Sequence, residues 1–234
     1  MLRWHYRSQH ESLIALSNRA FYDSNLVLFP SPDGERSYSG LRVQHNPDSV
    51  YDRGGSRTNR LEAAEVVQGV MAHAREFPHL SLGVATFSGA QQKAIQLELE
   101  QARANDPSCE SFFAQHEHEP FFVKNLENVQ GDERDVIFIS VGYGRDKNGK
   151  VNLNFGPLNG RGGERRLNVL ITRSRLRCVV FTNMTSADID LKRTDALGIK
   201  YLKEYFAFAE TGDLEQIEVE PDDKERPFFD SVKA

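Results

Sequence analysis

Two polar stretches of the chain carry residue types that could do phosphate chemistry. Gln130 to Asp135 holds a glycine, three acids and an arginine, and Gly163 to Arg175 holds four arginines. A guanidinium stabilises the negative charge that develops on phosphate oxygens during phosphoryl transfer, and a glycine lets the backbone approach a ligand closely. The same residues also fit a plainer interpretation, with arginines on a helix surface near its carboxyl end and acids in a solvated turn.

Both stretches adjoin elements that would hold them in place. Val136 to Ile139 has no polar side chain and predicts a strand buried on both faces of a parallel sheet, as does Cys178 to Phe181. Between them the spacing predicts a helix, whose apolar stripe comprises Leu167, Leu170, Ile171 and Ser174. Arg166, Val169 and Arg173 share a neighbouring face. Strand, helix and strand in this order indicate a βαβ unit.

Val129 to Ser140, followed by Gly163 to Arg175, resembles motifs V and VI of superfamily 1 helicases. The closest branch includes the nonsense-mediated-decay RNA helicase and its bacterial relatives. Leu82 to Gln92 is similar to motif IVa, and Arg7 to the arginine of motif IV. The resemblance covers about residues 1–210. It implies the second, C-terminal RecA-like domain of a helicase core, an α/β fold with a mainly parallel sheet, helices on both faces and no P-loop.

The resemblance also implies an ATP site. Arg7 and Arg173 would reach the γ-phosphate as catalytic arginines, meeting on one lip of the fold, and Glu133 would accept a ribose hydroxyl. The full set of ATP-binding expectations is Tyr6, Gln130, Gly131 and Glu133, and for Tyr6 packing on the core is an equal alternative. ATP and Mg²⁺ would bind only together with an N-terminal RecA-like domain of the same polypeptide that carries the Walker motifs. Asp135 is expected to be structural.

A second set of residues is expected to touch nucleic acid. Hydroxyl groups and amides at a helix start suit a phosphate, so Thr86 and Ser88 are candidates, although both fit equally well as N-cap residues. Asn128 and Thr172 are weaker candidates for the same surface. The implied partner is single-stranded DNA or RNA.

Length, composition and net charge limit the number of domains, the class of partner and the compartment. The 234 residues allow one large domain or two small ones, and a net charge of −5 argues against a free-standing nucleic-acid binder, though not against one local basic face. No apolar run is long enough to span a bilayer, no signal peptide is recognisable, and two cysteines fit a reducing, cytoplasmic compartment. The abrupt start suggests a fragment of a longer protein.

Two further patterns resemble functional motifs, a P-loop and a metal site, but favour a plainer interpretation. Gly144 to Lys150 has P-loop spacing, but Val151 stands where a hydroxyl is needed and no helix is expected to follow, which favours a hairpin loop. The glycine-rich insert Gly144 to Gly162 is expected to be a mobile loop near the strand path or a solvent loop. His116 to Glu119, with Cys109 upstream, reads as a solvated charge run, so no metal site is predicted.

The remaining elements follow from periodicity. The helix expected over residues 10–22 begins with Ser8 as N-cap and Glu11 completing a capping box. Further helices are expected over residues 59–77, 91–103 and 196–209, and further strands over residues 40–44, 82–87 and 121–123. Residues 1–211 are expected to form the RecA-like domain, and residues 212–234 an acidic linker or tail.

The residues, taken together with the resemblance, leave three functions open. The first is the C-terminal half of an ATP-dependent helicase or translocase, inactive as the isolated chain. The second is a non-catalytic RecA-like module that binds nucleic acid or another protein. The third is a complete small ATPase that uses the loop at Gly144.

Overall fold

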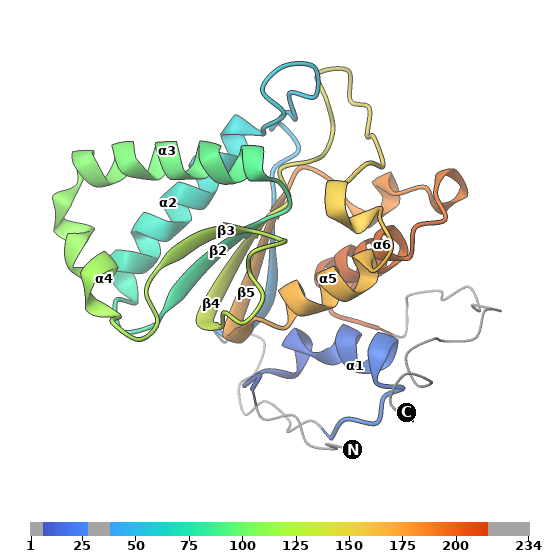
Figure 1. Cartoon of the computed structure of the whole chain (residues 1–234), viewed down its shortest axis with the longest axis horizontal. Helices are drawn as coiled ribbons and strands as arrows, with labels where there is room; N and C mark the ends of the chain where they lie inside the picture. The colour runs from blue at the N-terminus through green and yellow to red at the C-terminus, as the bar shows by residue number, and fades with distance from the viewer. Residues whose placement is uncertain (1–6, 28–37, 215–234) are drawn as a thin grey trace.

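The computed structural model describes residues 7–27 and 38–214 and is built around a five-stranded sheet. Its strands lie in the order β1-β5-β4-β2-β3, and all neighbours are parallel (Figure 1). They are β1 (Gly40–His45), β2 (Leu82–Thr86), β3 (Phe122–Asn125), β4 (Arg134–Ser140) and β5 (Ser174–Thr182). The predicted α/β fold with a parallel sheet is confirmed. All strands therefore begin at one edge, the amino edge, and end at the opposite carboxyl edge.

Helices cover both faces of the sheet, as expected (Figure 1). One face carries α2 (Arg60–Glu76), α3 (Gly89–Asn105) and the unpredicted α4 (Glu110–Gln115). The other carries α1 (Ala15–Phe21), α5 (Gly163–Ile171) and α6 (Leu197–Thr211). The helix starts agree with local sequence signals, since the Asn59 side chain caps α2 and the Ser88 side chain caps α3.

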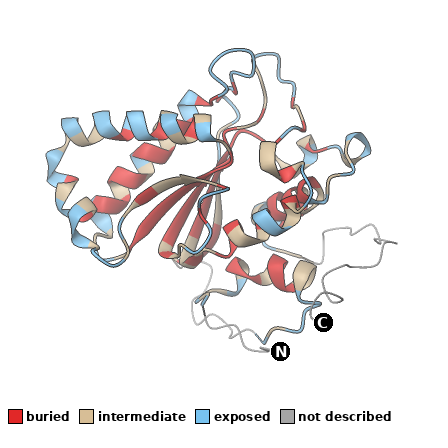
Figure 2. Ribbon diagram, in the orientation of Figure 1, coloured by how far each residue is buried: buried red, intermediate tan, exposed pale blue. Residues whose placement is uncertain are grey.

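The central strands are buried on both sides, which explains their unbroken apolar sequence. Val136 and Phe138 of β4 point into the core beneath α2 and α3, whereas Ile137 and Ile139 point into the core beneath α5 and α6. Figure 2 shows these central strands as buried. A strand flanked by helices on both faces has no solvent side, so its side chains need not alternate between polar and apolar.

Two predictions about helix ends are wrong. Ser8 is not the N-cap of a helix: a short 3-10 helix, Glu11–Leu13, begins after His10, whose ring accepts from the backbone N–H of Ser12, and α1 follows from Ala15. Ser174 does not belong to the stripe of α5, because that helix ends at Ile171 and Ser174 opens β5. Arg173 consequently lies in the turn between helix and strand.

The insert from Gly144 to Gly162 is not a solvent loop. Arg145 and Val151 form an antiparallel bridge that closes a hairpin turn, so the P-loop spacing is accidental and the hairpin interpretation is confirmed. Beyond the bridge the chain packs four apolar side chains into the core under α5 and α6, namely Val151, Leu153, Phe155 and Leu158. The glycines and asparagines between these residues led to the prediction of a solvent loop. The apolar side chains pack into the core instead, and this packing fixes the segment.

The carboxyl end of the described chain is α6, which stops at Thr211 before Gly212, whose φ of +72° suits the left-handed cap. Most of the expected tail, residues 215–234, lies outside the described residues, so the division at residue 211 stays a prediction. Within residues 7–27 and 38–214, no helix is both long and apolar enough to cross a bilayer.

Candidate functional site

The amino edge of the sheet brings together three residues that the sequence analysis singled out. Arg7 precedes the first helical turn, Glu133 directly precedes β4, and Arg173 directly precedes β5. The Nε of Arg7 forms an ion pair with Oε2 of Glu133 at 2.8 Å. Arg7 and Arg173 interact electrostatically, as do Glu133 and Arg173. These side chains form what we call the arginine cluster, at the amino edge of the sheet, which is the lower end of the strands in Figure 1.

Arg173 is held by the end of α5 and by the segment before β4. Its Nε donates to the carbonyl of Val169 at 2.7 Å, and its Nη1 lies 3.5 Å from the carbonyl of Asp132. Its backbone carbonyl accepts from the N–H of Arg134 at 3.2 Å. Among the residues that the structure describes, no carboxylate lies within ion-pair distance of this guanidinium. The guanidinium of Arg173 is therefore oriented by neutral carbonyl oxygens, and no described carboxylate is in direct contact with it.

Arg7 reaches the cluster through a tertiary contact. The backbone N–H of Gln9 donates to the carbonyl of Arg175 at 2.7 Å, which lays the segment before α1 along the start of β5. The Arg7 side chain is 39% exposed and the Glu133 side chain 38% exposed, so their ion pair is open to solvent and exchangeable. Tyr6 falls outside the described residues, so its expected contact with adenine or ribose cannot be placed in the cluster.

The electrostatics of the cluster favour an anion. Burial lowers the pKa of Arg173, and the positive charge of Arg7 lowers it further, while Glu133 and Asp132 act in the opposite direction. Two guanidinium groups that repel each other are stabilised when a polyanion takes up position between them. Both arginines remain charged, so each can contact an anion such as a phosphate group.

The turn that leads into β4 exposes the other two predicted ATP contacts. Gln130 and Gly131 are both exposed. Gly131 has a φ of +90°, and no heavy atom lies within 4 Å of where a Cβ would stand, so backbone conformation and not crowding requires glycine here. The turn thus offers free backbone and an amide side chain next to the arginine cluster.

Beside the cluster lies an ion-pair network that sequence reasoning only partly found. Both terminal nitrogens of Arg175 contact the carboxylate of Glu119, and its Nε donates to Asp135 at 3.0 Å. The hydroxyl of Ser81 donates to both carboxylates, at 2.6 Å to Glu119 and 3.0 Å to Asp135. Asp135 also accepts from the backbone N–H of Ser81 at 2.9 Å, which fits the structural role expected for it. No local signal marked Glu119 or Ser81.

This network makes acid stability depend on Glu119. The Arg175 guanidinium holds the pKa of Glu119 at about 2, against an ordinary value of 4.5. A depressed pKa means that the stabilisation is complete above pH 4.5 and is lost as the pH falls towards 2. We expect Glu119→Gln to be less stable than the parent near neutral pH, with the difference shrinking over that acid range in urea unfolding. The exposed neighbour variant Glu117→Gln should run parallel to the parent, and a constant difference for Glu119→Gln would contradict the assignment.

The residues predicted to touch nucleic acid do not share one surface. Thr86 ends β2 and Ser88 begins the turn into α3, so both lie at the carboxyl edge, about 20 Å from the arginine cluster given the length of a seven-residue strand. The Thr86 hydroxyl is buried and donates to the carbonyl of Ser88 at 2.9 Å, while the Ser88 side chain accepts from Gln91. The N-cap interpretation of Ser88 is confirmed, and Thr86 stabilises the turn from inside.

The two weaker candidates lie apart from each other. The Thr172 hydroxyl is nearly buried and donates to the carbonyl of Asn168 at 2.8 Å, at the amino edge next to Arg173. Asn128 is exposed in the return segment between β3 and β4. The prediction that all four residues share one surface is therefore wrong. Only Ser88 and Asn128 present polar atoms near solvent.

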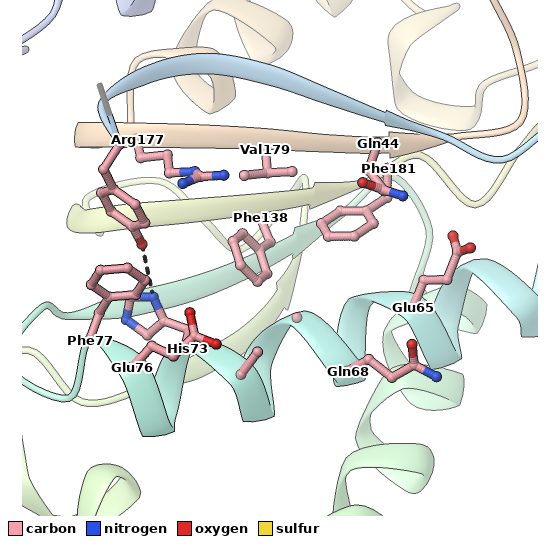
Figure 3. A pocket seen from close by; sticks show the side chains of 13 residues that line it. Gln44, Glu65, Gln68, His73, Glu76, Phe77, Phe138, Arg177, Val179 and Phe181 are labelled. Atoms are coloured by element: carbon pink, nitrogen blue, oxygen red, sulfur yellow. Dashed lines mark hydrogen bonds between the residues drawn. The ribbon is translucent and has the colours of Figure 1, made fainter. Parts of the chain in front are cut away.

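Another hollow lies away from both edges. A pocket of about 460 Å³ opens between α2 and the strands β1, β5 and β4, with Phe138 and Phe181 on its floor (Figure 3). The hydroxyl of Tyr38 and Nδ1 of His73 share a hydrogen bond of 3.3 Å at one end. None of the predicted site residues lines it. Of the His116 to Glu119 run, the His116 ring bonds to the carbonyl of Pro78, and within the described segments no three His, Cys, Asp or Glu side chains could hold a metal ion.

Comparison with known proteins points to one family. The family model described as "AAA domain" matches residues 1–185. An uncharacterized ATP-dependent helicase of Mycoplasma pneumoniae is 34% identical over 217 residues, and one of Mycoplasma genitalium is 34% identical over 216 residues. Each match covers 90% of this chain but 18% of the relative, so the chain spans less than a fifth of the length of these curated relatives.

Proposed function

The chain belongs to this AAA-domain family and is a superfamily 1 helicase-like domain, and from that premise we propose that it is the C-terminal RecA-like half of an ATP-dependent helicase or translocase. Its arginine cluster would complete an ATP site whose phosphate cradle and Mg²⁺ ligands come from an N-terminal RecA-like domain. The single-stranded nucleic acid would pass over the carboxyl edge.

The observation that carries this proposal is the state of Arg173. Its guanidinium is half-buried, oriented by the carbonyls of Val169 and Asp132, and not ion-paired within the described part of the chain. Arg175 nearby is by contrast ion-paired with Glu119 and Asp135. An oriented, uncancelled charge beside a second arginine suits the developing charge on a γ-phosphate.

Each residue at this edge of the sheet would contact a different part of the nucleotide. Arg173 would contact the γ-phosphate in the transition state. Arg7 would join it after its ion pair with Glu133 opens, and the Glu133 carboxylate, which also lies 3.6 Å from Arg175, would accept a ribose hydroxyl. The exposed Gln130 and Gly131 would approach the nucleotide through side-chain amide and backbone. Mg²⁺, when bound by the partner domain, would neutralise charge between the phosphates.

The alternative of a complete ATPase within this chain has little support, because the loop at Gly144 is a hairpin and not a phosphate cradle. A non-catalytic module remains the rival, and ATP turnover separates it from our proposal. We expect the isolated chain to show essentially no hydrolysis, and a polypeptide that also includes an N-terminal RecA-like domain to show hydrolysis stimulated by single-stranded nucleic acid. Absence of turnover in the longer polypeptide would favour the rival, and turnover by the isolated chain would contradict both.

A further inference from the structure

At the carboxyl edge a groove of about 560 Å³ runs between the loop that follows β1 and the outer side of α3. One wall is the segment from Ser56 to Arg60, and the other is the part of α3 from Ala90 to Gln101. The groove begins at Ala90, two residues after the Ser88 cap. It therefore continues directly from the strand-to-helix turn, at the upper end of the sheet in Figure 1.

The groove pairs a cationic rim with an apolar floor. Arg60 projects from one wall and Lys93 from the other, both are exposed, and neither forms an ion pair with a described residue. Between them the surface is aliphatic, contributed by Ala63, Ala90, Ala94 and Leu97. Leu97 is 60% exposed. Glu98 is the one acid in the lining.

The two walls are locked together at the base of the groove. The backbone N–H of Asn59 donates to Oε1 of Gln91 at 2.9 Å, and Nε2 of Gln91 donates back to the carbonyl of Asn59 at 3.0 Å. Below them the buried Glu62 carboxylate accepts from the Ser140 hydroxyl at 2.6 Å and from the Gly142 N–H at 2.8 Å. The backbone positions that carry Arg60 and Lys93 are thus held relative to each other.

We propose that this groove binds the sugar–phosphate backbone of the single strand, with Arg60 and Lys93 each contacting a phosphate. The proposal rests on the proposed function and adds the residues that hold the strand. Backbone contacts of this kind need fixed cations over a surface that accepts sugars or bases, and a prearranged spacing reduces the entropic cost of binding. Because the chain has a net charge of −5, the cations that bind phosphates must be gathered at one place on its surface.

The test uses the longer polypeptide with the double variant Arg60→Glu and Lys93→Glu, and measures binding of labelled oligothymidylate and oligouridylate by fluorescence anisotropy at several salt concentrations. Each lost phosphate contact lowers the slope of log affinity against log salt by about 0.7 for a single strand. We therefore expect a slope smaller by about 1.4, weaker binding of both oligonucleotides, and unchanged hydrolysis without nucleic acid.

The matched control is Lys192→Glu with Arg193→Glu, the same charge change in a short 3-10 helix that packs with the opposite face of the sheet. It should leave the slope close to that of the parent. An unchanged slope and affinity in the groove variant would overturn the inference and favour a protein partner there. Loss of hydrolysis without nucleic acid in a folded groove variant would also overturn it. The proposed function would stand in either case if Arg173→Ala abolished hydrolysis.

Discussion

Replacing Arg173 with alanine in the longer polypeptide should reduce the turnover number for ATP hydrolysis by about 10³- to 10⁵-fold, the range found when a transition-state arginine is removed. The reason is that the guanidinium acts on charge that develops only in the transition state, in a half-buried setting where each interaction counts for more than in water. Binding of single-stranded nucleic acid should persist, because Arg173 lies at the amino edge and the groove at the carboxyl edge. Steady-state hydrolysis and oligonucleotide binding measure the two quantities separately.

Two further variants make this result interpretable. Arg173→Lys keeps the charge but loses the planar fork that also donates to Val169, so we expect only partial recovery. Arg165→Ala removes a 56% exposed arginine from α5, the helix that precedes Arg173, and should leave hydrolysis close to the parent. The catalytic assignment of Arg173 would be contradicted if Arg173→Ala kept the hydrolysis rate of the parent, or if Arg165→Ala lowered the rate as much as Arg173→Ala does.

Replacing Phe155 with alanine should destabilise the domain by about 3–5 kcal/mol, as expected for a fully buried aromatic side chain. Phe155 has 0% exposure, lies in the core beneath α5 and α6, and packs against the ring of Tyr143 with centroids 5.8 Å apart. For a domain of this size the loss corresponds to a fall in the melting temperature of about 10 °C. Thermal unfolding followed by circular dichroism measures it.

The control lies in the same insert. Lys147→Ala changes an exposed residue in the hairpin turn closed by the bridge from Arg145 to Val151, and should alter the melting temperature little. If both variants behaved alike, the insert would be a solvent loop after all. The comparison therefore decides whether this glycine-rich stretch belongs to the core.

Periodicity and end signals in the sequence determined most of the fold. The apolar runs of β4 and β5, the helical stripes of α2 and α3, and the caps at Asn59 and Ser88 depend on neighbours within a few residues, so they can be predicted locally. The polar stretches around Glu133 and Arg173 pointed to phosphate chemistry for the same reason, because each is a continuous segment next to a buried strand.

Only the tertiary structure decided which of these residues meet. The contact of Arg7 with Glu133, the network of Ser81, Glu119 and Arg175, and the groove between Arg60 and Lys93 join segments far apart in the chain. Such contacts depend on strand order and register, and no local pattern encodes either. For the same reason Thr86 turned inward and the insert at Phe155 entered the core, because burial is set by whatever packs on the other side.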